Sequence, residues 1–196
     1  MKNRRKRRGT GLLIVAFIVL AVFLGFLVLR KYESRRVQPV VPPQTQQAGT
    51  VSVMLFFATP EGDGLAREGR EIEACQGPEE CALSVVEELI NGPVGDLEPV
   101  LPPAATVRGV QIIGDTARVD LGKETVAALP AGSSAELLAV YAVVNTVTAN
   151  VPQIKKVQLL VDGQEAQTLK GHVDLRQPLV PDPKLEHTQP EQGTNR

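Results

Sequence analysis

The sequence has no tryptophan, only two histidines and two cysteines, and few aromatic residues. Beyond residue 36 the aromatic side chains are Phe56, Phe57 and Tyr141, which leaves little surface on which bases could stack. Two cysteines and two histidines exclude a disulfide-dense mini-protein and a zinc site built from several Cys and His ligands. We therefore expect no metal site and no cofactor.

Charge is divided unevenly along the chain. Residues 1–36 hold ten basic residues and one acid, for a net charge of +9, whereas the rest holds 11 basic residues against 21 acids, for a net charge of −10. The total of −1 therefore combines a basic N-terminus with an acidic remainder. An acidic domain without a basic stripe argues against nucleic acid as a partner, because phosphate binding needs clustered Lys and Arg.

A long apolar run follows the basic N-terminus. Residues 9–29 carry no charge and as a helix would span about 31 Å, the thickness of a bilayer core. The alternative is a cleaved signal peptide, but its apolar core is shorter and ends in small residues, whereas this run ends in Arg30 and Lys31. No cysteine stands there to carry a lipid. We predict an uncleaved single-pass helix in the cytoplasmic (inner) membrane.

The flanking charges predict the orientation of this helix. More basic residues precede it than follow it, which favours a cytoplasmic tail over residues 1–8 and an extracytoplasmic or periplasmic C-terminal domain. Residues 30–50 are rich in Pro and Gln, which is typical of a linker. Residues 51–180 form the predicted domain, and the polar residues 181–196 are expected to be a disordered tail.

Hydrophobic periodicity and turn residues predict the elements of the domain. Ser133 and Glu136 have the spacing of a capping box, which marks the start of the second helix. We expect helices over 80–91 and 135–150 and strands over 51–57, 65–72, 106–113, 116–121, 156–161 and 164–169, with 172–175 as a candidate for one more. The order predicts an α+β domain of short antiparallel strand pairs with two helices packed on one sheet face.

An ordered set of short motifs resembles the GerMN domain family of GerM-like and LpqB-like extracytoplasmic domains. The motifs are Val53-Met54-Leu55-Phe56-Phe57, Glu68-x-Arg70-x-Ile72, Leu89-Ile90-Asn91-Gly92-Pro93, Leu101-Pro102-Pro103, Ala117-Arg118-Val119-Asp120-Leu121, Asn145-Thr146-Val147-Thr148 and Val157-Gln158-Leu159-Leu160-Val161-Asp162-Gly163. The resemblance covers the whole predicted domain in one copy. It implies a fold related to ring-building modules of secretion machines, a role in interaction or scaffolding, and no catalytic residues.

Cys75 and Cys81 lie six residues apart. This spacing does not match a C-x2-C zinc clamp, and no second ligand pair is present. Outside the cytoplasm the two thiols would oxidise to a disulfide, which we favour over free or redox-active thiols. Closing so short a loop is expected to contribute about 2 kcal/mol of stability.

Glu68 and Arg70 are two residues apart on a predicted strand, so both side chains point to the same sheet face. One interpretation is a pair that binds an anion or a partner in a cleft. The other is an ordinary ion pair, which contributes less than about 1 kcal/mol when exposed. We retain the pair as the candidate binding site.

Other candidates for chemistry have simpler explanations. His172 and Asp174 are interpreted as a surface strand pair, because no local motif places a nucleophile beside them. Glu79 and Glu80 suggest the paired carboxylates of a glycosidase, but they suit a helix N-terminus better. No catalytic residue is nominated.

The sequence thus favours a non-catalytic, membrane-anchored interaction or scaffold domain of the bacterial cell envelope. Its expected partners are the membrane, through the N-terminal helix, and an envelope protein or a second copy. The alternative is a ligand-binding module for a cell-wall fragment or small anion.

Overall fold

The computed structural model describes residues 18–27 and 49–187, which belong to two separate compact units. In the first unit, residues 18–27 are helical. The described part of the chain contains no helix with the length and apolar character needed to cross a bilayer. The predicted transmembrane helix over 9–29 extends on both sides beyond the described helix, and the predicted linker lies almost entirely outside the described residues. Both stay predictions.

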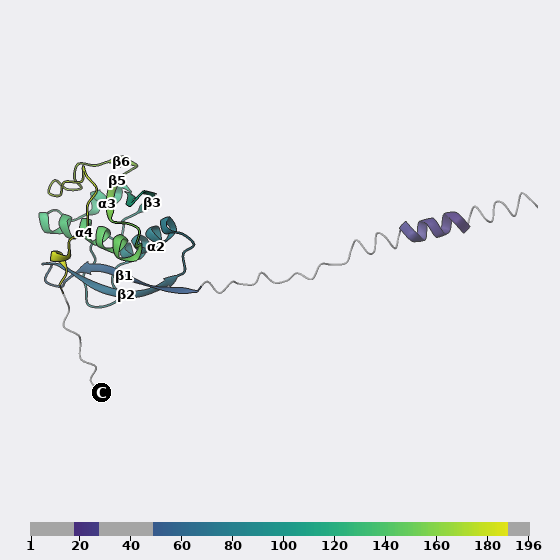
Figure 1. Ribbon diagram of the computed structural model, residues 1–196, viewed down its shortest axis with the longest axis horizontal. Helices are drawn as coiled ribbons and strands as arrows, with labels where there is room; N and C mark the ends of the chain where they lie inside the picture. Colours follow the sequence, from purple (N-terminus) through teal and green to yellow (C-terminus); the bar gives the residue numbers. More distant parts are fainter. Residues whose placement is uncertain (1–17, 28–48, 188–196) are drawn as a thin grey trace, which may run out of the picture. The chain divides into compact units, whose positions relative to one another are not determined.

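The second unit opens with an antiparallel hairpin of β1 (Thr50–Ala58) and β2 (Leu65–Glu73). The strands are each one or two residues longer than predicted. Val53 and every residue of β1 from Leu55 to Ala58 are buried in the core, so the second half of the strand is covered on both faces. The hairpin forms a two-stranded sheet of its own (Figure 1).

The second sheet contains β3 (Val107–Ile113), β4 (Thr116–Leu121), β5 (Lys156–Val161) and β6 (Gln164–Glu165), in that order. The pairs β3–β4 and β5–β6 are antiparallel hairpins, as predicted, but β4 pairs with β5 in parallel. The connection between β4 and β5 contains the second long helix, and parallel neighbours need such a crossover. The prediction of antiparallel pairs alone was therefore wrong at this position.

The helices α2 (Pro78–Ile90) and α4 (Ser133–Asn150) lie between the two sheets (Figure 1). The helix α4 packs against β1 and β5, and α2 packs against β1 and β3. The domain is α+β as predicted, but the helices are not confined to one face of a single sheet. Because α4 meets a sheet on each side, a nearly continuous run of its residues, from Leu138 to Val147, is buried.

Side chains of α4 close the outer edge of β1. The Asn150 amide accepts from the N–H of Met54 at 2.8 Å and donates to its carbonyl at 2.7 Å. One turn earlier, the hydroxyl of Thr146 accepts from the N–H of Phe56 at 3.2 Å. At the end of the strand, Ala58 exchanges two backbone hydrogen bonds with Glu98. These contacts satisfy backbone groups that an open edge would leave to solvent or to another strand.

The predicted capping box at the start of α4 is wrong. Gly132 is the N-cap, with φ at 129°, and no side chain caps the helix. The Glu136 side chain turns instead toward a distant loop. A short helix, α3 (Lys123–Ala128), was not predicted, because six residues are too few to show a period.

The C-terminal part of the domain also differs from the prediction. The strand β6 has two residues rather than six, and 172–175 form no strand. In the predicted disordered tail, residues 181–187 are ordered: Pro183–Leu185 form a 3₁₀ turn, and the N–H of His187 donates to the carbonyl of Leu65 at 2.7 Å. Residues 188–196 of that tail lie outside the described residues.

Candidate functional site

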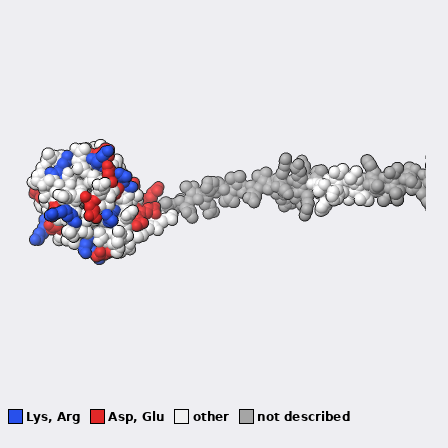
Figure 2. Space-filling view, turned by 90° about the horizontal axis from the view of Figure 1, so that it is seen from above, with Lys and Arg blue, Asp and Glu red and all other residues white. Residues whose placement is uncertain are grey.

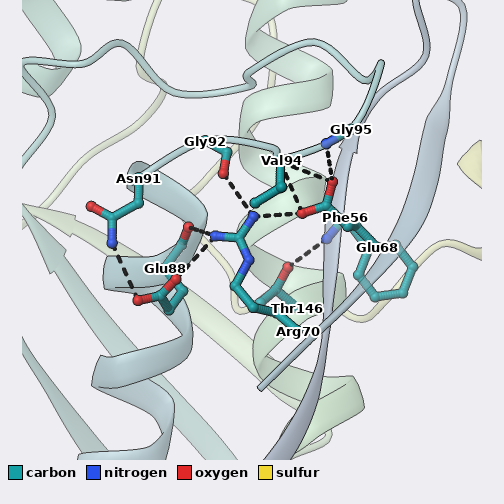
Figure 3. Close-up of polar contacts among 9 residues, drawn as sticks. All are labelled: Phe56, Glu68, Arg70, Glu88, Asn91, Gly92, Val94, Gly95 and Thr146. Carbon is teal, nitrogen blue, oxygen red and sulfur yellow. Dashed lines mark hydrogen bonds and ion pairs between the residues drawn. The ribbon is translucent and has the colours of Figure 1, made fainter. Parts of the chain in front are cut away.

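The candidate pair, Glu68 and Arg70, lies in the middle of β2 on the core side of the hairpin. The register places Glu68 opposite Leu55 and Arg70 opposite Val53, both of which are buried. The side chains point the same way, as their spacing predicts, and they contact each other at 2.5 Å (Figure 3). Each is mostly covered, with 14% of the Arg70 side chain and 15% of the Glu68 side chain exposed.

The Arg70 guanidinium joins β2 to the end of α2 and to the loop that follows. Its Nη1 donates to the Glu88 carboxylate at 3.0 Å and to the Glu88 carbonyl at 3.4 Å. Its Nη2 donates to Glu68 and to the carbonyl of Gly92 at 2.9 Å (Figure 3). The cation also lies 5.8 Å from the centre of the Phe57 ring. Burial lowers the pKa of Arg70, but its two carboxylate partners raise it more, so the group stays charged.

The Glu68 carboxylate receives the same loop from its other side. It accepts from the N–H of Val94 at 3.1 Å and from the N–H of Gly95 at 3.2 Å. Burial raises the pKa of Glu68, but the two backbone donors and Arg70 outweigh that effect, so the pKa is lowered overall. The pair therefore holds the loop after α2 against the hairpin.

This arrangement has consequences for the binding role expected of the pair. An anion that approached Arg70 would have to compete with Glu68, Glu88 and the Gly92 carbonyl for its N–H donors. Among residues 18–27 and 49–187, the buried Nε of Arg70 has no hydrogen-bond partner. Ligand binding by Glu68 and Arg70 stays a prediction. The contacts that the structure shows hold the loop after α2 against the hairpin.

The predicted disulfide joins Cys75 to Cys81, with Cα atoms 5.1 Å apart. It closes the segment that leads into α2, and Cys81 packs against the core. Both acids of the first turn of α2 have defined partners. Glu80 accepts from the N–H of Gln76 at 2.9 Å, and Glu79 accepts from the N–H of Ile112 on β3 at 3.0 Å. Both carboxylates bind backbone amides that lie outside α2, so neither caps the N-terminus of this helix as expected.

Glu136 was predicted to cap the start of α4, but its side chain has a different role. Its carboxylate is fully buried and accepts from three backbone amides, those of Leu169 and Lys170 at 2.9 Å and of His172 at 2.8 Å. The ring Nδ1 of His172 lies 3.0 Å from the same carboxylate. Burial raises the pKa of Glu136, but these donors outweigh it and lower the pKa overall. Asp174, the predicted partner of His172, pairs with Arg176 instead.

A hollow of about 430 Å³ lies beside α4, away from the candidate pair. Asn145 contributes to its wall and is 1% exposed. Its oxygen accepts from the N–H of Asp182 at 3.3 Å, but its Nδ2 has no hydrogen-bond partner in the part of the chain that the structure describes. Arg67 and Lys155 supply positive charge at the same hollow. Arg67 also pairs with Glu186 and lies 5.5 Å from the centre of the Phe56 ring.

The charged surface is mixed. On the face of the domain in Figure 2, basic and acidic side chains are interspersed, without a broad basic area. Among residues 18–27 and 49–187, no group of three or more His, Cys, Asp or Glu side chains is placed to hold a metal ion.

Residues 54–167 match the family model of the Germane domain, which is described as sporulation and spore germination. The chain belongs to this family. The match runs from the middle of β1 to just past β6 and so contains both sheets and the helices between them. A comparison with curated proteins found no match to this chain.

Solved structures support the same fold. The structure named "Putative Lipoprotein from Clostridium perfringens" is 28% identical, with a TM-score of 0.50 over 67% of this chain and 88% of that one. The tandem GerMN domains of the sporulation protein GerM from Bacillus subtilis are 17% identical, with a TM-score of 0.56 over 70% of this chain. This chain covers 48% of the tandem structure.

Proposed function

We propose that the chain is a non-catalytic interaction domain of the bacterial cell envelope, held at the cytoplasmic membrane by its N-terminal apolar segment. The family match over residues 54–167 carries this proposal, because the resemblance to GerMN domains implies interaction or scaffolding rather than chemistry. The N-terminus is placed in the cytoplasm and the domain on the outer side of the membrane.

Two observations support the compartment. The domain contains a disulfide between Cys75 and Cys81, and disulfides persist in oxidising compartments outside the cytoplasm. The 28%-identical relative from Clostridium perfringens is named a lipoprotein, a class held at a membrane surface by lipid. In this chain an apolar helix would take the place of the lipid.

The direction of the pKa shifts argues against a general-acid role for two enclosed carboxylates. A general acid works best when its pKa is raised toward the working pH. The two enclosed carboxylates that fasten loops, Glu68 and Glu136, have lowered pKa values, because each accepts hydrogen bonds from several backbone amides. Both are kept as anions, which suits a structural task.

A cysteine-labelling experiment tests the topology. Asn3→Cys and Lys184→Cys would each add a thiol to the full-length chain, and the native cysteines, joined to each other, do not react with maleimides. On intact cells an impermeant maleimide should label Lys184→Cys and leave Asn3→Cys unlabelled until the cells are lysed. Labelling of Asn3→Cys alone would overturn the proposed orientation.

Chemical crosslinking of the full-length chain in native membranes tests the interaction role. We expect a discrete oligomer or a reproducible envelope partner, identified by sizing and mass spectrometry. A clean monomer at crosslinker concentrations that capture a known membrane complex would contradict the scaffold function.

The second candidate function is binding of a cell-wall fragment or small anion. The observation that favours it is the hollow beside Asn145, whose buried amide nitrogen has no hydrogen-bond partner among the described residues, in a wall that also carries Arg67, Lys155 and Glu186. Muropeptides and inorganic phosphate should then raise the melting temperature of the chain. Lys155→Ala should remove that shift if the hollow is the site, and Arg70→Lys should remove it if the pair on β2 is.

A further inference from the structure

The β1–β2 hairpin has one closed edge and one open edge. On β1, side chains of α4 and the backbone of Glu98 occupy the outward groups of Met54, Phe56 and Ala58. On β2, the described part of the C-terminal segment closes the first residue alone, where Leu65 pairs with Glu186. Among the described residues, the edge of β2 beyond Leu65 is therefore open to another strand.

The outward positions of β2 follow from its register. Gly69 lies opposite Met54 and Arg67 opposite Phe56, and the amides of Met54 and Phe56 point away from the hairpin toward α4. In an antiparallel pair such opposed residues both direct their backbone groups outward, so Arg67, Gly69 and every second residue beyond them do so too. Within residues 49–187 the outward backbone groups of Arg67, Gly69 and Glu71 have no hydrogen-bond partner.

The sequence along this edge is complementary to itself. Residues 67–71 read Arg-Glu-Gly-Arg-Glu. When two copies run antiparallel with Gly69 at the centre, Arg67 of each faces Glu71 of the other, and Glu68 of each faces Arg70 of the other. We propose that β2 pairs with β2 of a second copy about a two-fold axis at Gly69.

The geometry of the strand suits this register. Gly69 on the axis, and Arg67 with Glu71 on either side of it, would be the hydrogen-bonded pairs, with Cα atoms about 5.5 Å apart. Opposite charges directly across an antiparallel pair attract, whereas like charges repel. The Glu71 side chain is exposed and has no ion-pair partner among the described residues, and 60% of the Arg67 side chain is exposed despite its contact with Glu186.

Gly69 leaves the centre of the edge bare. It is exposed, and a Cβ built at this position would have no atom within 4 Å. The domain itself therefore does not need a glycine here for space, nor for a positive φ, which Gly69 does not have. A glycine in a strand interior weakens that strand and often marks a place where another backbone comes close. A second β2 is such a backbone.

Pairing would also extend the two-stranded hairpin into a larger sheet. A two-stranded sheet is marginal by itself, and joining two of them produces a continuous sheet of four strands. Anchoring in one membrane raises the effective concentration of the copies, so a small interface can suffice. Any chain as long as the predicted linker over residues 30–50 spans up to about 70 Å when fully extended, a length that would let both domains stay attached to the same bilayer.

This inference rests on the proposed interaction function and names its partner as a second copy of the chain. Cysteine variants of the full-length chain in native membranes test it. Under mild oxidation Gly69→Cys should give a disulfide-linked dimer, because the two Cα atoms on the axis are within disulfide range. Glu71→Cys alone is the matched control: its counterpart lies four residues along the strand, about 14 Å away, so it should stay monomeric.

Register is tested by co-expression of two tagged chains. Arg67→Cys and Glu71→Cys should crosslink to each other, whereas neither should crosslink to itself. Self-crosslinking of both would indicate a parallel pairing and would overturn the proposed axis.

Charge reversal provides an independent test on the Gly69→Cys background. Glu71→Arg places two arginines opposite each other at both symmetric positions, and the crosslinked fraction should fall about tenfold. Adding Arg67→Glu restores opposite charges and should restore the dimer. Resistance to a protease, compared with the unmodified chain, shows that each variant is folded.

The outcomes separate this inference from the function beneath it. If chemical crosslinking captures an envelope partner but Gly69→Cys gives no dimer, the β2 pairing is wrong and the interaction function stands. If both experiments give only monomer, both proposals fail. A Gly69→Cys chain that ends at His187 provides a further comparison. If this shorter chain gives the dimer and the full-length chain does not, the removed residues block the edge of β2, and the proposed pairing is wrong for the full-length chain.

Discussion

Replacing Glu136 by glutamine tests whether a single buried carboxylate fastens the loop after β6. The carboxylate accepts from three backbone amides and the ring of His172. In glutamine, one oxygen can still accept from Leu169 and Lys170, but an amide NH₂ then faces the N–H of His172. Two donors that face each other cannot bond, so the N–H of His172 loses its acceptor, while the new NH₂ can donate to the ring Nδ1 of His172 in the tautomer that leaves this nitrogen unprotonated.

The magnitude follows from the hydrogen bonds that the substitution removes. Hydrogen bonds to a charged group contribute about 1.5–3 kcal/mol each, and an unsatisfied buried donor costs about 1–3 kcal/mol. The His172 ring is 45% exposed, so its interaction with the carboxylate is screened by solvent and adds little. Glu136→Gln should therefore lower the free energy of unfolding by about 2–4 kcal/mol, a large share of the stability of an ordinary domain.

Urea unfolding of a fragment over residues 47–196, followed by circular dichroism at pH 7, measures this decrease. Hydrogen exchange should accelerate first at the amides of Leu169, Lys170 and His172. Glu61→Gln is the control, because Glu61 is exposed and makes no ion pair or side-chain hydrogen bond in the described chain; it should change stability by less than about 0.5 kcal/mol. A decrease below about 1 kcal/mol for Glu136→Gln, or unchanged exchange at these three amides, would refute the reasoning.

The pH dependence of the free energy of unfolding provides a second test of Glu136. Because the folded-state pKa of Glu136 is lowered, its contribution is complete above the unfolded pKa of about 4.5 and is lost as the pH falls through the folded pKa. The stability difference between the parent and Glu136→Gln should shrink as the pH falls below about 4.5.

Three further predictions concern the disulfide, the β1 edge and the loop after α2. Replacing Cys75 and Cys81 together by serine should lower stability by about 2 kcal/mol, and reductant should then have no further effect on the melting temperature. Asn150→Ala removes both hydrogen bonds to the backbone of Met54 and should cost about 1–3 kcal/mol in urea unfolding, with faster exchange of the Met54 amide as the local readout. Glu68→Gln should cost about 1–2 kcal/mol and speed exchange of the two loop amides that donate to its carboxylate; unchanged exchange would show that Arg70 alone holds the loop.

Local patterns in the sequence predicted the elements whose causes are local. The strands β1, β3, β4 and β5 each begin and end within one residue of the ranges that the sequence predicts. The two-residue spacing of Glu68 and Arg70 likewise predicted that both side chains share a face. A strand period and a turn type are set by neighbouring residues, so one sequence is enough to find them.

The predictions that were wrong concern contacts between residues that lie far apart along the chain. Ser133 and Glu136 match a local capping pattern, but the partners of Glu136 lie 33–36 residues later, and backbone amides in a loop carry no sequence signal. The partners of Arg70 are similar: the carbonyl of Gly92 could belong to any residue type. A helix pattern also cannot tell whether one sheet or two will cover it, which is why the placement of α4 was wrong.

The closure of the β1 edge by α4 has a consequence for the size of any assembly built through the hairpin. Strand-to-strand growth into a fibre needs two free edges on each molecule, one to receive the next copy and one to offer. Thr146 and Asn150 occupy the first of these edges with hydrogen bonds inside the same chain. A pair joined through β2 would consume the second on both molecules at once, so polymerisation through this sheet stops at two copies.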